Sequence, residues 1–140
     1  MAWLAPRIVW LTLMLATIGA GLIVRATVAG PAGKYAGIAL YAVMMVWCVL
    51  FVRPRTRAPA ACVGALLVCW LVEALQATGL PARLHRSVPG VHLVLGEVFA
   101  WSDMAWYVVG ALAAGALLMV KAWTGKHRPT THNSLTDRVD

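Results

Sequence analysis

Four apolar runs, each about 20 residues long and nearly free of charged side chains, dominate this sequence. About 20 apolar residues cross the bilayer as a helix, which satisfies its own backbone amides where no water is present. Hydrophobic residues make up 61% of the 140-residue chain and charged residues only 12%, whereas about a quarter of a soluble domain is charged. The sequence therefore predicts an all-α integral membrane protein with a four-helix transmembrane bundle.

The predicted membrane spans are residues 7–27, 34–53, 60–78 and 102–123. A short Gly/Pro-rich turn at residues 29–33 makes the first two spans antiparallel neighbours. We expect residues 1–124 to form one transmembrane domain and the polar residues 125–140 to form a disordered cytoplasmic tail.

The segment between the third and fourth spans, roughly residues 80–101, is neither a span nor an ordinary loop. Its apolar part is about a dozen residues long, which is too short to cross a bilayer and is typical of a re-entrant or interfacial piece. Irregular backbone at membrane depth must be covered by protein or line a wet cavity, because lipid cannot hydrogen-bond its amides. This segment is therefore a first pointer to a site.

The distribution of Lys and Arg predicts the orientation and the class of partner. Eight of the twelve lie at the end with both termini, namely Arg7, Arg53, Arg55, Arg57, Lys121, Lys126, Arg128 and Arg138. The positive-inside rule then places both termini of this multi-pass membrane protein in the cytoplasm. Because the basic residues stand in small groups between apolar runs, the net charge of +7 indicates contacts with lipid head groups and no nucleic-acid partner.

Most of the remaining ionisable residues gather at the opposite, outer end of the bundle. A charged side chain at a helix centre costs ~2.5–3.5 kcal/mol on insertion scales, so such residues are candidates for function. The predicted ligand-binding residues are Arg25, Lys34, Tyr41, Glu73, Gln76, Arg83, Arg86 and Asp103. The candidate catalytic residues are Glu73, Asp103, His92 and Tyr107.

Helical spacing predicts which of these side chains face one another. Glu73 shares a helix face with Gln76 and Cys69, while Asp103 and Tyr107 are four residues apart in the next span. Turning both stripes inward brings the acids and the outer arginines into one pocket.

Structural readings compete with these functional ones. Arginines near the interface also serve as snorkelling anchors. Glu73 is expected to form at least an intrahelical ion pair. Asp103 also suits a helix N-terminus, with Ser102 as the capping residue.

No cofactor or metal is expected from the sequence. The three cysteines lack the spacing of a metal site, and neither His85 nor His92 has a second ligand at helical spacing. No Gly-rich phosphate loop follows a strand, and no G-x-S-x-G nucleophile motif occurs.

An ordered set of short motifs between residues 21 and 115 resembles a known family. The motifs are Gly21-Leu22-Ile23-Val24-Arg25, Pro31, Gly33-Lys34-Tyr35, Ala39-Leu40-Tyr41-Ala42, Glu73-Ala74-Leu75-Gln76, Arg83 or Arg86, Leu95-Gly96, and Phe99-Ala100-Trp101-Ser102-Asp103 with Tyr107 and Gly110. Together they resemble domain-of-unknown-function family 2809, and the resemblance implies a four-helix bacterial membrane protein. The E-x-x-Q stretch is also faintly similar to the VanZ-like, teicoplanin-resistance group. One departure is the absence of an acid near Ile38, where the family pattern has one. The resemblance implies no established activity.

Three functions fit these residues. The first is a non-catalytic accessory protein whose outer pocket binds an anionic amphiphile, that is a membrane lipid, or a partner subunit, including a second copy of the chain. The second is an intramembrane hydrolase or transferase that uses Glu73 and Asp103 as a carboxylate pair. The third is a subunit of a larger transport or ion-translocating complex.

Overall fold

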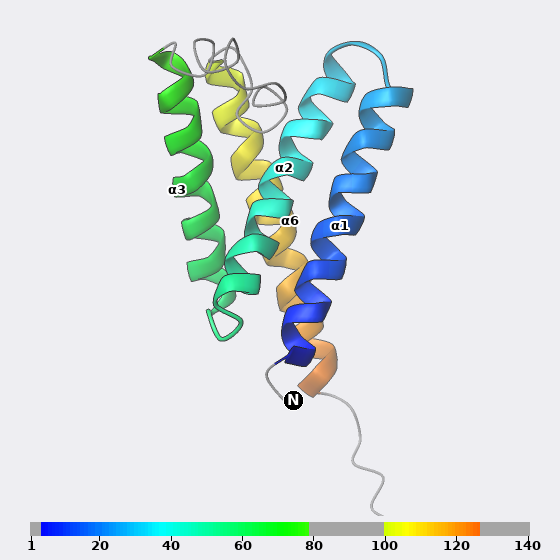
Figure 1. The fold of residues 1–140 in the computed structure, drawn as a ribbon, viewed down its shortest axis with the longest axis vertical. Helices are drawn as coiled ribbons and strands as arrows, with labels where there is room; N and C mark the ends of the chain where they lie inside the picture. The colour runs from blue at the N-terminus through cyan, green and yellow to red at the C-terminus, as the bar shows by residue number, and fades with distance from the viewer. Residues whose placement is uncertain (1–3, 79–99, 127–140) are drawn as a thin grey trace, which may run out of the picture.

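The computed structural model describes residues 4–78 and 100–126 of the protein. This part of the chain contains four long helices, α1 (Leu4–Thr27), α2 (Gly30–Val52), α3 (Ala58–Ala77) and α6 (Trp101–Lys126). They alternate in direction, so the start of α1 and the end of α6 lie at the same end of the bundle (Figure 1). By length and composition all four can cross a membrane. The predicted four-helix, all-α architecture is confirmed, and it indicates a multi-pass membrane protein.

The start of α2 corrects the predicted turn at residues 29–33. The helix begins at Gly30 instead of Lys34, with Pro31 in its first turn and Ala29 as an N-cap without a side-chain hydrogen bond. Proline fits the first turn of a helix because the N–H that it lacks has no partner there. Gly30 has a φ of 78°, which glycine adopts without strain. Only two residues therefore connect α1 to α2.

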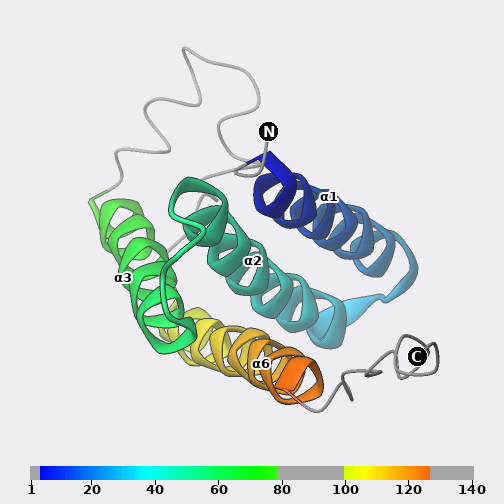
Figure 2. The ribbon, with the colours of Figure 1, turned by 90° about the horizontal axis from the view of Figure 1, so that it is seen from below.

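Helix α2 is the centre of the bundle (Figure 2). It packs against α1 on one side and against α3 and α6 on the other, and α3 also packs against α6. No α carbon of α1 comes within 8 Å of α3 or α6 in the described residues, so α1 is held mainly by α2. Helix α1 is thus the outlying helix of the four.

The core of the bundle consists of small, branched and aromatic side chains. One cluster contains Val46, Trp47, Leu50, Ala61, Ala65 and Ala114, and a second contains Ala42, Cys69 and Tyr107. Helices α6 and α2 approach closely at Gly110, where an added Cβ would collide with the carbonyl oxygen of Ala39 and lie 2.9 Å from the Cβ of Ala42. Small residues at such a contact allow two helices to approach closely.

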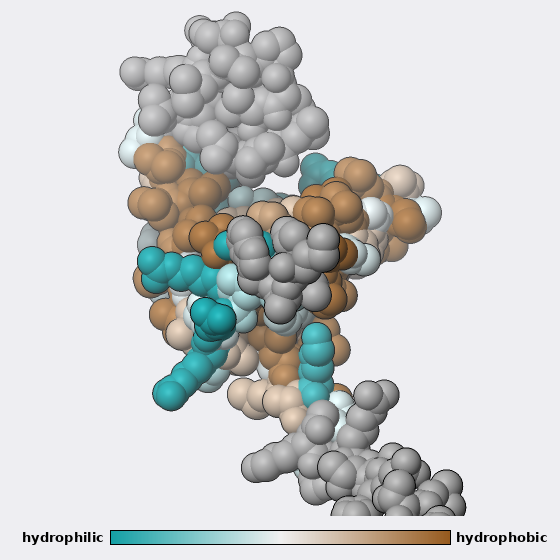
Figure 3. Space-filling view, turned by 60° about the horizontal axis from the view of Figure 1, so that its bottom comes forward, coloured by the Kyte–Doolittle hydropathy of each residue, from teal (hydrophilic) through white to brown (hydrophobic). Residues whose placement is uncertain are grey.

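The ends and flanks of the bundle differ in polarity (Figure 3). Apolar surface covers the flanks, and hydrophilic side chains gather at the end where α2 connects to α3. Arg53, Arg55 and Arg57 belong to this connection and are exposed. The re-entrant or interfacial segment predicted at residues 80–101 falls outside the described residues except for Ala100 and Trp101. The predicted tail falls outside them from residue 127 onward.

Candidate functional site

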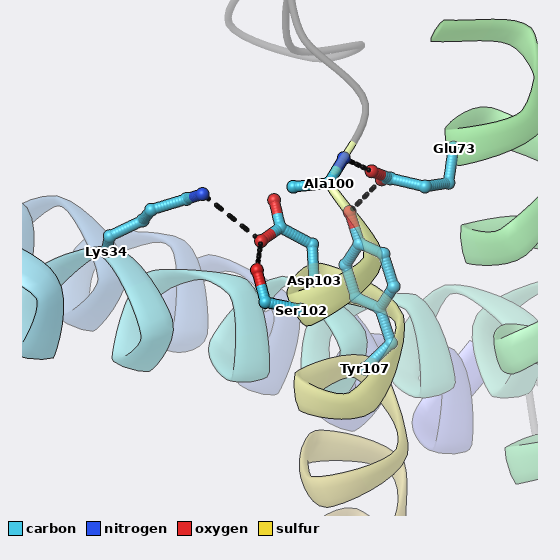
Figure 4. A network of polar contacts seen from close by, with 6 residues as sticks. All are labelled: Lys34, Glu73, Ala100, Ser102, Asp103 and Tyr107. Carbon is cyan, nitrogen blue, oxygen red and sulfur yellow. Dashed lines mark hydrogen bonds and ion pairs between the residues drawn. The ribbon is translucent and has the colours of Figure 1, made fainter. Parts of the chain in front are cut away.

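Glu73 is an almost completely buried acid that joins α3 to the start of α6. Its side chain is 1% exposed. The backbone N–H of Ala100 donates a hydrogen bond of 2.8 Å to Oε1, and the hydroxyl of Tyr107 donates one of 3.1 Å to Oε2 (Figure 4). Ala100 immediately precedes α6, so its amide belongs to the positive end of that helix, which favours an acid. Glu73 therefore ties two helices together and has no intrahelical ion pair in the described residues, contrary to the prediction.

Asp103 joins the start of α6 to the start of α2. Its Oδ1 lies 3.2 Å from the Nζ of Lys34 and accepts a hydrogen bond of 3.0 Å from Ser102 (Figure 4). The Lys34 side chain is 49% exposed and that of Asp103 11%. Next to this pair, the rings of Tyr35 and Trp106 stack with 5.2 Å between their centroids. Polar and aromatic contacts thus fasten α2 to α6 at one end of the bundle.

The position of Ser102 corrects its predicted role as the N-cap. Helix α6 begins at Trp101, so Ser102 lies inside the first turn, where it hydrogen-bonds to Asp103. In a capping box, the acid in the first turn reaches back to the N-cap amide. Here that amide, the N–H of Ala100, is bound by Glu73 from another helix. Asp103 is consequently available for Lys34.

The helix stripes predicted from spacing face inward. The buried face of α3 includes Cys69, Glu73 and Gln76. On α6, Asp103 and Tyr107 are buried. Tyr41 contributes its ring, whose centroid lies 6.1 Å from that of Tyr107. The spacing argument therefore placed five side chains correctly on the inner faces of their helices, namely Cys69, Glu73, Gln76, Asp103 and Tyr107.

A shallow, open hollow lies where α1 turns into α2. Its volume is about 340 Å³, and it is lined by Arg25, Val28, Ala29, Gly30, Gly33 and Lys34. In the part of the chain that the structure describes, no acid forms an ion pair with Arg25. The lining includes Gly30 at the start of α2, a helix N-terminus that no side chain caps. The hollow therefore combines two cations with the positive end of a helix.

The structure divides the predicted single pocket into two parts. Arg25 and Lys34 line the hollow. Glu73 and Tyr107 lie in the protein interior, and Asp103 connects the two parts through its contact with Lys34. Arg83, Arg86 and His92 lie outside the described residues.

Sequence reasoning missed the backbone groups of the site. The amide of Ala100 carries no side-chain signature, so nothing in the sequence assigns it to Glu73. The start of α2 at the hollow was missed for another reason, because Gly30-Pro31-Ala32-Gly33 was interpreted as a turn. Proline is also common in the first turn of a helix. The same residues could therefore have been interpreted as a helix N-terminus, which would have identified the amides at the start of α2.

The geometry gives the carboxylate-pair enzyme hypothesis no added support. A general acid or base must reach a substrate. Glu73 is 1% exposed and Tyr107 6%, and both oxygens of Glu73 accept hydrogen bonds from the protein. The packing of α3 against α6 accounts for the two hydrogen bonds of Glu73 without a substrate. Among residues 4–78 and 100–126, moreover, no three His, Cys, Asp or Glu side chains come together as metal ligands.

Comparison with known proteins identifies the family. Neither the curated proteins nor the solved structures contain a match. Residues 29–111, more than half of the chain, match the family described as "Protein of unknown function (DUF2809)". The matched region contains Lys34, Glu73 and Asp103, whereas Arg25 precedes it. As its motifs predicted, the chain belongs to the DUF2809 family.

Proposed function

We propose that this chain is a non-catalytic membrane protein that binds the anionic head group of a membrane amphiphile in the hollow between α1 and α2. The observation that carries the proposal is the presence of Arg25 and Lys34 in one open hollow at the end of two membrane-spanning helices. Head groups lie at this depth of the bilayer, where cationic side chains attract anionic lipids.

The charges around the hollow favour an anion. Asp103 balances Lys34, but half of the Lys34 side chain remains exposed, and Arg25 has no acidic partner among the described residues. Guanidinium binds a phosphate through two hydrogen bonds, and ammonium binds it as a point charge. The start of α2, which no side chain caps, also lines the hollow at Gly30, and a helix N-terminus favours negative charge. A phosphate-bearing head group fits these donors.

We also propose that both termini are cytoplasmic in a bacterial inner membrane, which places the hollow in the outer leaflet. At the end with the termini, the described residues include six basic residues and no acid, namely Arg7, Arg53, Arg55, Arg57, Lys121 and Lys126. This asymmetry follows the positive-inside rule. A C-terminal fluorescent protein that folds only in the cytoplasm should therefore fluoresce, whereas a dark, fully expressed fusion would reverse the orientation.

The substitution Arg25→Gln tests the head-group site. Arg25 is exposed and makes no ion pair with a described acid, so its loss removes a ligand contact without breaking a helix contact. A basic residue near anionic lipid contributes about 1 kcal/mol, which corresponds to about a fivefold change in affinity. Native mass spectrometry with phosphatidylglycerol and phosphatidylcholine should show about that loss for the anionic lipid only.

Arg55→Gln is the matched control, because Arg55 is an exposed arginine at the opposite end of the bundle. We expect it to leave the tightest phosphatidylglycerol site unchanged. Equal losses for the two variants would show that binding is nonspecific and would refute the proposal. The recovery of a dimer that binds no phosphatidylglycerol would instead support a second copy of the chain as the partner.

A further inference from the structure

The positive charge at the hollow is smaller than its two cations suggest. Arg25 and Lys34 line the hollow and give it two positive charges. The carboxylate of Asp103 lies 3.2 Å from the Nζ of Lys34 and supplies one negative charge (Figure 4). Glu73, the other acid among the described residues, binds groups of α6 and forms no ion pair with either cation. Among the described residues, the hollow therefore has one positive charge that no acid balances.

Asp103 is held in place by α6 as well as by Lys34. It lies in the first turn of α6, where the positive end of the helix favours an acid. The hydroxyl of Ser102 donates a 3.0 Å hydrogen bond to its Oδ1, and its side chain is only 11% exposed. Lys34 has a flexible stem, and half of its side chain is exposed. An anion that binds Lys34 therefore meets a carboxylate that stays where it is.

An anion bound to Lys34 lies close to Asp103. An oxygen that hydrogen-bonds to an ammonium is about 3 Å from the nitrogen, so two such oxygens are at most about 6 Å apart. This distance is shorter than the Debye length of about 8 Å at physiological ionic strength, so salt screens their repulsion only in part. Asp103 thus opposes each additional negative charge on the ligand.

Phosphodiesters and phosphate monoesters differ in the charge that they bring to these groups. A phosphodiester has two unesterified oxygens and one negative charge, and the two oxygens match the paired N–H groups of a guanidinium. Arg25 offers such a guanidinium and has no acidic partner in the described part of the chain. A phosphate monoester has a second pKa of about 6 and therefore carries nearly two charges at neutral pH. Its second charge meets Lys34, whose charge Asp103 already balances.

Resting on the proposed function, we propose that the hollow binds a phosphodiester head group with one negative charge in preference to a phosphate monoester with two, and that Asp103 determines this specificity. The carboxylate acts by repelling the competitor, as repulsive groups do at other specific sites. Among anionic membrane amphiphiles, phosphatidylglycerol belongs to the preferred class and phosphatidic acid to the disfavoured one.

Two lipids that differ by one methyl group test this inference. Dioleoyl phosphatidic acid and its methyl ester, dioleoyl phosphatidylmethanol, have the same acyl chains, but at about pH 8 phosphatidic acid carries nearly one more negative charge. Native mass spectrometry in detergent measures the affinity of the protein for each lipid. We expect the wild-type protein to bind the methyl ester at least as tightly as phosphatidic acid. A preference for phosphatidic acid of about threefold or more would overturn the inference.

The substitution Asp103→Asn removes the negative charge and nearly keeps the shape of the side chain. The ratio of the two affinities should shift toward phosphatidic acid by about fivefold, the effect of about one charge next to an anionic lipid. The matched control is Ser102→Ala, which removes the hydrogen bond to Asp103 and leaves its charge, so the ratio should stay within about twofold of the wild-type value. An unchanged ratio in Asp103→Asn, or an equal shift in Ser102→Ala, would overturn the role of Asp103.

The substitution Arg25→Gln separates this inference from the proposed function. If it weakens the binding of both lipids while Asp103→Asn leaves their ratio unchanged, the head-group site stands and the specificity assigned to Asp103 is wrong. If it changes the binding of neither lipid, the head-group site itself is wrong. The comparison of the two lipids on the wild-type protein decides the inference if Asp103→Asn does not fold.

Discussion

The hydrogen bond between Tyr107 and Glu73 makes the role of Glu73 as a helix tie measurable. Tyr107→Phe removes this 3.1 Å bond and keeps the ring in place. Hydrogen bonds between membrane helices contribute ~0.6 kcal/mol on average and up to ~1.7 kcal/mol. Both side chains are buried here and the acceptor belongs to an acid, which places the bond in the upper part of that range. We expect the free energy of unfolding to fall by about 1–1.5 kcal/mol.

Glu73→Gln should cost more than Tyr107→Phe. Glutamine keeps one carbonyl oxygen for two donors, the N–H of Ala100 and the hydroxyl of Tyr107, and directs its amide N–H₂ toward one of them. A buried donor without an acceptor costs about 1–3 kcal/mol, so we expect a loss of about 2–3 kcal/mol. In the double variant, the N–H of Ala100 is the only one of the two donors left for the carbonyl oxygen of glutamine. The loss of stability in the double variant should therefore differ from the sum of the two single losses by about 1 kcal/mol.

Unfolding by sodium dodecyl sulfate in mixed micelles, followed by circular dichroism, measures these losses. Tyr41→Phe is the matched control, because the hydroxyl of Tyr41 has no hydrogen-bond partner among the described residues, although its ring lies beside that of Tyr107. We expect this control to stay within about 0.3 kcal/mol of the wild-type protein. Equal effects of the two Tyr→Phe changes, or strict additivity with Glu73→Gln, would refute the helix-tie role.

The same unfolding assay tests two other contacts. Lys34→Met and Asp103→Asn should show a coupling free energy of a few tenths to about 1 kcal/mol. This coupling should decline with added salt, because half of the Lys34 side chain is exposed. A coupling of zero at low salt would contradict the ion pair. Gly110→Ala should lower stability by about 1–3 kcal/mol through its collision with Ala39, whereas Gly19→Ala should be neutral or stabilising by up to about 1 kcal/mol; equal effects would contradict the close α2–α6 approach.

Length and hydropathy alone predicted the fold. Each span needs about 20 apolar residues, and short connections force neighbouring spans to be antiparallel. The predicted start of α2 was wrong for an identifiable reason. Gly30 and Pro31 are typical of a turn, but they also suit the first turn of a helix, and local sequence does not distinguish the two without the neighbouring helix.

The site was only partly predictable. Helical spacing correctly placed Glu73 and Tyr107 on inner faces, because spacing determines which side chains share a face. The partners of these residues depend on which helices are neighbours. Lys34 meets Asp103 only because α2 lies beside α6, and Glu73 binds a backbone amide that any residue at position 100 would supply, proline excepted.

A crystal structure grown from a lipid mesophase that contains phosphatidylglycerol tests the proposed head-group site most directly. The account predicts a phosphate within ion-pair distance of both Arg25 and Lys34. An empty hollow at saturating phosphatidylglycerol, with lipid phosphates bound only near Arg53, Arg55 and Arg57, would contradict it.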